Sequence, residues 1–203
     1  MRTADTIYQD LLPELPGVPE PMVERALLRC AQELCRRARV WTVWTDPVTI
    51  QDGTTEYDVE LPEAGAQVHV IERATRNGRF MEMVPWTFLR AAPDEPRAGA
   101  RLVPGRISFQ TSGLVPGDQI RFRVVLTPTD TANGVPDDVF DQNSDLLVAG
   151  IKARLMLTPN QPFTNFDLGA ANASAWSAGV ATAGVRTWRG NTDGTKRDRV
   201  MWC

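Results

Sequence analysis

The sequence predicts an α+β fold: a helical bundle with an inserted antiparallel β-sheet module and an extended C-terminal tail. Near both ends of the chain, apolar residues recur at every third or fourth position, a pattern typical of amphipathic helices. Between these segments, apolar and polar residues alternate and Gly-containing turns separate the runs, as in half-buried strands. The final residues are polar and basic. We therefore expect a single domain over residues 1–190 and a docking tail over residues 191–203.

The expected helices follow from their start and stop signals. Pro21 suits the first turn of a helix, because the N–H that proline lacks would have no partner there. Asp137 and Asp138 favour a helix start through the helix dipole, and Thr158–Pro159 ends that helix. Gly190 supplies a stop for the last helix. The helices are expected over about residues 2–12, 20–43, 138–157 and 165–189.

Two of these helices show their packing rows in the sequence. In the second helix the apolar residues share one face, and they are Val23, Leu27, Cys30, Leu34, Ala38 and Trp41. The last helix has two neighbouring rows with a spacing of four residues. The larger row is Leu168, Trp176, Val180 and Trp188. The small row is predicted to let another backbone approach closely, and its helix-packing residues are Ala171, Ala175, Gly179 and Ala183.

The β module is expected over about residues 47–127. Alternating apolar residues on both sides of Asp52–Gly53 predict a first hairpin over residues 47–61. Asn77–Gly78 predicts the turn of a second hairpin, because these residues readily take the positive φ angles of a tight turn. The last strand has one apolar face, formed by Ile120, Phe122, Val124 and Leu126.

Composition limits the function classes. The formal net charge is −3, so the chain is not expected to bind nucleic acid through its overall charge. The apolar run over residues 146–157 is interrupted by Lys152 and Arg154 and is too short to span a bilayer, so no membrane association is expected. The three cysteines do not form a secreted disulfide framework. We expect synthesis in a reducing cytoplasm.

No catalytic, cofactor-binding or metal-binding residue is predicted, and the chain is not expected to be an enzyme. His69 is the sole histidine and lies in an alternating strand without a nucleophile motif. Four acidic residues after Pro136 lack the ligand spacing of a calcium loop, and they are Asp137, Asp138, Asp141 and Asp145. The sequence has no phosphate-binding or dinucleotide-binding glycine motif. An enzyme site assembled from scattered Asp and Arg residues stays open as an alternative.

The end of the last helix and the tail combine aromatic and basic residues. Trp188 and Trp202 lie near or within this basic segment, and an apolar ring among arginines is typical of an anchor for a protein partner. The alternative is a tail that folds back on its own subunit or is disordered. The residues predicted to contact a partner are Trp188, Arg189, Lys196, Arg197, Arg199 and Trp202.

Four segments carry a family resemblance through their order and spacing. They are residues 31–41, 52–59, 77–80 and 151–165. The last contains Ala153-Arg154-Leu155, followed by a Pro-x-x-Pro-aromatic corner that ends at Phe163. Together, over residues 26–190, they resemble the head-to-tail adaptor (connector) proteins of tailed bacteriophages.

The resemblance implies a structural protein of the virion neck, synthesised in the cytoplasm of the bacterial host. It implies a ring of twelve copies beneath the portal protein, with helices around a DNA channel and the C-terminal segment reaching into the portal. The implied partners are the portal protein, other copies of the chain, tail or nozzle proteins, and genomic DNA that passes without sequence-specific binding. The alternatives are a tail-completion or stopper protein of the neck and a small nucleic-acid-binding module.

Overall fold

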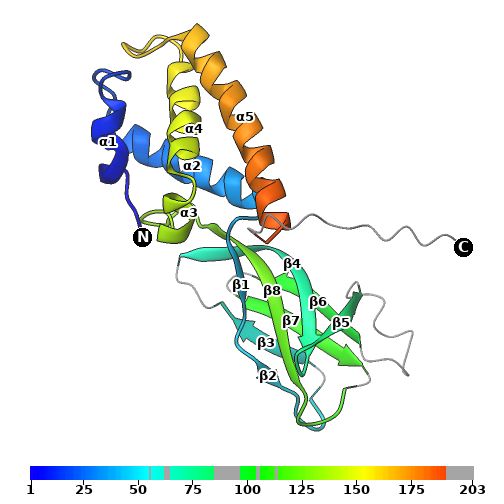
Figure 1. Ribbon diagram of the computed structural model, residues 1–203. Helices are drawn as coiled ribbons and strands as arrows, with labels where there is room; N and C mark the ends of the chain where they lie inside the picture. Colours follow the sequence, from blue (N-terminus) through cyan, green and yellow to red (C-terminus); the bar gives the residue numbers. More distant parts are fainter. Residues whose placement is uncertain (55, 62–64, 85–96, 104–105, 113, 191–203) are drawn as a thin grey trace, which may run out of the picture.

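The computed structural model describes the chain apart from residues 55, 62–64, 85–96, 104–105, 113 and 191–203. The helices gather at one end of the molecule and the strands at the other (Figure 1). The predicted docking tail over residues 191–203 lies outside the described residues.

Five helices occur in the described residues. Their bounds are Asp5–Leu11 (α1), Glu20–Ala38 (α2), Asp137–Asp141 (α3), Ser144–Met156 (α4) and Phe166–Trp188 (α5).

Helix α2 ends at Ala38, earlier than the expected residue 43. The next residue, Arg39, takes the left-handed conformation with φ of 54°, and its N–H donates to the carbonyl of Cys35. This closes the last helical turn in the manner of a left-handed C-cap. The chain then continues as a strand, so the expectation that residues 39–43 are helical is wrong.

The helix expected over residues 138–157 is two helices, α3 and α4, and Asn143 lies between them. Its Nδ2 donates to the carbonyl of Val139 at 2.9 Å, and its Oδ1 accepts from Nη2 of Arg186 at 2.7 Å. An amide side chain that bonds to the preceding turn competes with the helical backbone. The break falls in the polar residues 141–145, ahead of the apolar run over residues 146–157. Asn143 is the N-cap of α4, and asparagine is favoured at that position.

Eight strands form one sheet in the described part of the chain. Their order in the sheet is β1-β8-β4-β5-β6-β7-β3, and β2 also pairs with β8. The expected module is antiparallel, but β5 and β6 pair in parallel. The strand bounds are Thr42–Trp44 (β1), Val48–Thr49 (β2), Glu56–Glu60 (β3), Ala66–Arg76 (β4), Arg79–Val84 (β5), Arg97–Val103 (β6), Arg106–Ser112 (β7) and Gln119–Pro128 (β8).

One of the two predicted hairpins is confirmed. Arg76 pairs with Arg79 across the Asn77–Gly78 turn, where both turn residues have positive φ. The hairpin predicted over residues 47–61 is wrong, because β2 pairs with β8 whereas β3 pairs with β7. The Asp52–Gly53 turn therefore lies between two strands that do not pair with each other.

The expected helical bundle is also wrong, although the fold is α+β. The sheet dominates the structure and curls into half a barrel (Figure 1). Its interior has an aromatic core: Tyr57 stacks on Phe109 at 5.2 Å between ring centroids, and Phe109 meets Phe122 edge-on at 4.9 Å. The helices do not form an independent bundle, because α2 packs against β8 as well as against α4 and α5.

Candidate interaction surface

Helices α4 and α5 approach each other closely through glycines. A Cβ added to Gly150 of α4 would lie 2.7 Å from Cε3 of Trp176, and one added to Gly179 of α5 would lie 2.4 Å from Cδ1 of Leu146. In the predicted small-residue row, Gly179 is half-buried and Ala183 is buried, whereas Ala171 and Ala175 are exposed. The row thus leads from the helix interface out to the surface.

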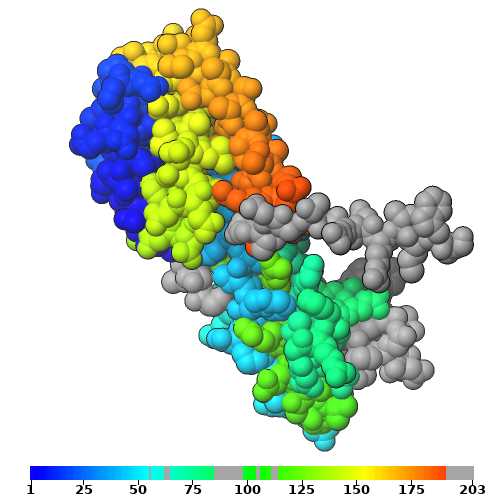
Figure 2. All heavy atoms as spheres, in the orientation of Figure 1, coloured from blue at the N-terminus to red at the C-terminus, as the bar shows by residue number. Residues whose placement is uncertain are grey.

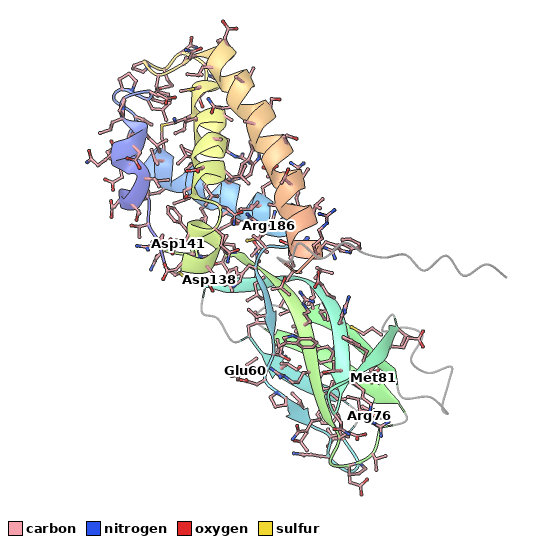
Figure 3. All side chains as sticks on the ribbon, in the orientation of Figure 1. Glu60, Arg76, Met81, Asp138, Asp141 and Arg186 are labelled. Atoms are coloured by element: carbon pink, nitrogen blue, oxygen red, sulfur yellow. The ribbon has the colours of Figure 1, made fainter. Side chains whose placement is uncertain are left out.

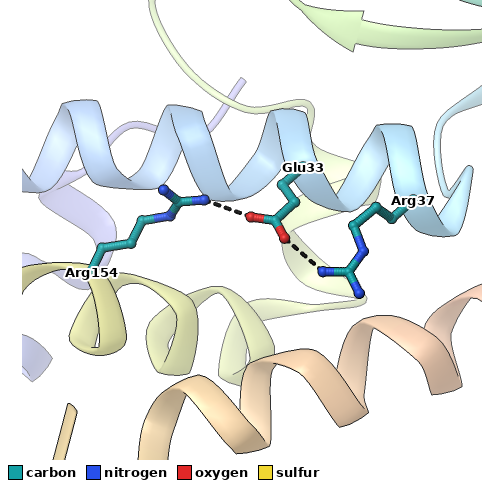
Figure 4. Close-up of polar contacts among 3 residues, drawn as sticks. All are labelled: Glu33, Arg37 and Arg154. Carbon is teal, nitrogen blue, oxygen red and sulfur yellow. Dashed lines mark hydrogen bonds and ion pairs between the residues drawn. The ribbon is translucent and has the colours of Figure 1, made fainter. Parts of the chain in front are cut away.

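A polar network ties the helices together beside this contact (Figure 4). Glu33 of α2 accepts from Arg37 at 2.7 Å and from Arg154 of α4 at 2.6 Å. Burial raises the pKa of the Glu33 carboxyl, but hydrogen bonds from Arg37 and Trp176 and the charge of Arg154 outweigh burial, so the pKa lies below its ordinary value. The network therefore stabilises the packing of three helices.

The outer face of α5 is uncharged over most of its length. Between Asp167 and Arg186 the helix has no charged residue, whereas the solvent face of a helix usually carries charged side chains. Figure 2 shows the outer side of α5 (orange) at the surface of the helical group. The exposed residues of this face, which we call the α5 face, are Ala171, Ser174, Ala175, Ala178, Ala181, Thr182 and Val185.

A basic groove lies beside the C-terminal end of the α5 face. It has a volume of about 620 Å³, and its lining includes four arginines and one carboxylate, Glu72. Glu72 pairs with Arg39 at 3.2 Å and with Arg123 at 3.5 Å. Trp188, a residue that is 70% exposed, also lines it. The arginines of this basic groove are Arg37, Arg39, Arg73 and Arg123.

The pKa of His69 on β4 is affected by nearby arginines. Partial burial of the ring lowers its pKa, and the charges of Arg36 and Arg39 lower it further. The ring is therefore mostly neutral at pH 7.

The opposite flank of α5 is acidic. Asp141 and Asp145 line a second hollow of about 370 Å³ together with Thr182 and Arg186 of α5. Figure 3 shows Asp138 and Asp141 on α3, close to the end of α5 that carries Arg186. We call Asp137, Asp138, Asp141 and Asp145 the acidic flank. The uncharged α5 face thus lies between a basic and an acidic region.

The structure places two of the predicted partner-contact residues, Trp188 and Arg189, at the end of α5. The other four, Lys196, Arg197, Arg199 and Trp202, lie outside the described residues. The arginines of the basic groove are absent from the sequence prediction, because they come from α2, β4, β8 and the turn after α2. The pairing of β4 with β8 places Arg73 opposite Arg123, and the packing of α2 against β8 places Arg37 and Arg39 nearby. No local pattern indicates these contacts.

No cluster of three or more metal-binding side chains occurs in the part of the chain that the structure describes. Among the described helices, none combines the length and the apolar composition that a membrane crossing requires. No known protein family matches this chain, and no curated protein has a matching sequence.

Proposed function

We propose that the protein is a structural head-to-tail adaptor of a tailed phage. It forms a ring beneath the portal, joins the capsid to the tail and lines the channel through which DNA passes. The observation that carries this proposal is the exposed α5 face, which is uncharged over residues 168–185. Water solvates such a face less well than a charged one, and small side chains allow a neighbouring helix to approach closely.

The charge of the chain supports passage of DNA rather than its retention. Strong binding to phosphates would hold a polyanionic genome in place, and such binding needs a concentrated excess of Lys and Arg. The net charge of −3 is the opposite of that excess. The basic groove is a local exception, and it favours a nucleic-acid-binding module as the second candidate function.

Association with the portal tests the proposal. Full-length protein and a version of residues 1–190 are each mixed with the portal protein of the same phage, and copies per portal are counted by native mass spectrometry. We expect several copies of the full-length protein per portal and fewer of the shortened form. If the full-length protein binds only after an adaptor is already in place, it is a stopper, and the adaptor proposal fails.

A variant of the α5 face makes this test specific. Ala178→Glu puts a charge on an exposed position of the face, so we expect normal folding and fewer copies per portal. Thr6→Glu is the matched control, because it adds the same charge at an exposed position of α1. Equal loss in both variants would show that added charge alone, and not the α5 face, matters.

Titration with duplex DNA separates the second candidate function. We expect weak binding at both low and high salt. Tight binding that falls steeply with salt would favour the nucleic-acid-binding module instead.

A further inference from the structure

We propose that copies of this chain associate head to tail, with the acidic flank of one copy seated against the basic groove of the next. This inference rests on the proposed ring and names the contact that would build it. The occupant of the groove is therefore a second copy of this chain.

The basic groove contains an arrangement that folding alone disfavours. Arg73 of β4 lies directly opposite Arg123 of β8 in the strand register, and like charges in opposed positions destabilise a sheet. Glu72 is the single carboxylate in the lining, and Arg39 shares it with Arg123. Arg37 pairs with Glu33 outside the lining. The surplus positive charge of the groove therefore belongs to Arg39, Arg73 and Arg123, with Glu72 as the one carboxylate in the lining.

Donors and apolar surface are both available in the groove. Arg73 makes a cation–π contact with Phe80 at 5.1 Å, and the residue is exposed. An arginine has five N–H donors, so a single ion pair or ring contact leaves others for an incoming carboxylate. Val70, Ile71 and Trp188 add apolar surface to the lining. A protein segment with carboxylates matches this combination better than a bare anion does.

The acidic flank has unused negative charge of the kind that the groove accepts. Asp137 and Asp141 are partly neutralised by Arg2, and the N-terminal amine also pairs with Asp137. Asp138 and Asp145 are exposed, and no ion pair among the described residues holds either of them. The flank thus offers two carboxylates to a partner.

The positions of the two regions on one helix decide the kind of contact. Thr182 and Arg186 line the acidic side of α5, whereas Gly184 and Trp188 line the basic side. One copy therefore presents opposite charges on two flanks of the α5 face. A contact of basic groove with acidic flank joins two different surfaces, which is a heterologous contact, and heterologous contacts close into rings when the rotation permits.

The tail of the same copy is a poorer occupant by charge. Its three basic side chains, Lys196, Arg197 and Arg199, outnumber its two acidic side chains, Asp193 and Asp198, so they would bring net positive charge to the groove. Self-association that is lost on removal of residues 191–203, but unchanged by charge reversal in the groove, would assign the contact to the tail and overturn the proposal.

Charge reversal in full-length protein tests the contact. Arg73→Glu reverses one charge of the groove and Asp138→Arg reverses one charge of the flank, and both residues are exposed, so both variants should fold. Sedimentation velocity at low salt measures self-association. We expect each variant alone to associate about tenfold more weakly than the wild type, because the new charge then faces like charges on the partner surface.

The decisive sample is an equal mixture of the two variants. In an alternating arrangement, the altered groove of one variant meets the altered flank of the other, and the two unaltered surfaces meet at the next contact. Every contact then joins opposite charges again, so the mixture should regain most of the wild-type association. Arg79→Glu is the matched control, because this exposed arginine of β5 lies outside the groove lining. Its association should equal that of the wild type.

Three outcomes would overturn the inference. They are variants that associate like the wild type, a mixture that associates no better than its parts, and a wild type that is monomeric both alone and on the portal. If Arg73→Glu instead removes binding of duplex DNA and leaves self-association unchanged, the groove is a nucleic-acid site.

The same samples on the portal separate this inference from the proposed function. Normal numbers of both variants per portal would reject the contact but keep the adaptor function. Self-association that the mixture restores, without any binding to the portal, would keep the contact and reject the adaptor function.

Discussion

Gly150 of α4 lies directly against the indole ring of Trp176 on α5. A Cβ at position 150 would be 2.7 Å from Cε3 of Trp176 and 2.9 Å from Sγ of Cys30. Trp176 is 7% exposed and Cys30 is fully buried. Neither neighbour is the free end of a flexible side chain, so the glycine sets how closely the two helices approach.

The first prediction concerns this contact. Gly150→Ala should destabilise the protein by about 1 to 2 kcal/mol. Overpacking a core costs about 1 to 3 kcal/mol, and the better helix propensity of alanine offsets up to about 1 kcal/mol of that cost. Urea unfolding measures the change. Gly184→Ala is the control: its Cβ would meet Cα of Ala38 at an ordinary 3.5 Å, so its stability should stay the same or rise. Equal destabilisation would contradict the packing argument.

The second prediction concerns the pH dependence of the Glu33 network. The folded pKa of Glu33 is below its ordinary value of 4.5, so its stabilising contribution is present above that pH and is lost as the pH falls through the folded pKa. Glu33→Gln should cost about 1 kcal/mol at pH 7, since the pairs are partly exposed to solvent. This difference from the wild type should shrink as the pH falls below 4.5.

Unfolding by urea at several pH values measures this difference. Glu24→Gln is the control, because Glu24 is an exposed carboxyl on the same helix. A Glu33→Gln variant whose deficit stays constant down to pH 3 would show that the ionised carboxylate is not what stabilises the helices.

The third prediction concerns the distal tip of the sheet. Asn77 donates to Oδ1 of Asp118 at 2.7 Å and accepts from the N–H of Gln119 at 2.8 Å. Glycine readily adopts the positive φ of 48° at this position, but Asn77→Gly removes both hydrogen bonds. The substitution should therefore lower the stability of the protein by about 1 to 2 kcal/mol. Asn77→Ala should cost more, because alanine also resists that φ. Thermal unfolding compares the two, and the reverse order would contradict the assignment.

The fourth prediction concerns thiol reactivity. Burial raises the pKa of Cys30 to about 11, with a smaller opposing effect of Arg154, and burial raises the pKa of Cys35 to about 12. In a Cys203→Ser variant, both remaining thiols should therefore react with a disulfide reagent at pH 8 only through unfolding. A thiol that reacts at once in the native protein would show that α2 is less well packed than described.

Local sequence signals predict some elements and miss the connections between them. The Asn77–Gly78 turn is determined by two adjacent residues, so the sequence identifies it. The pairing of β3 with β7 joins segments about fifty residues apart, as in Tyr57 opposite Phe109, and nothing near either strand indicates the partner. The half barrel follows from such pairings, and for this reason the predicted bundle and the first hairpin fail.

The candidate surface shows the same limit. Trp188 can be found from the sequence because a large ring at the end of a helix is a local feature. The opposition of Arg73 and Arg123 exists only through the register of β4 and β8, so the sequence of either strand alone does not identify these arginines as neighbours. Ala171 and Ala175 have the right size for packing, yet size alone does not tell which side of α5 faces solvent.

The chain enters the sheet along β1 and leaves it along β8, and these strands are paired, with Thr42 opposite Val125. Opposed Cα atoms in such a pair are about 5 Å apart. The gap that would remain if the strands beyond this pair were deleted is thus short enough for a tight turn to bridge. Evolution can consequently lengthen, shorten or replace the strands beyond this pair while the path of the helices stays the same.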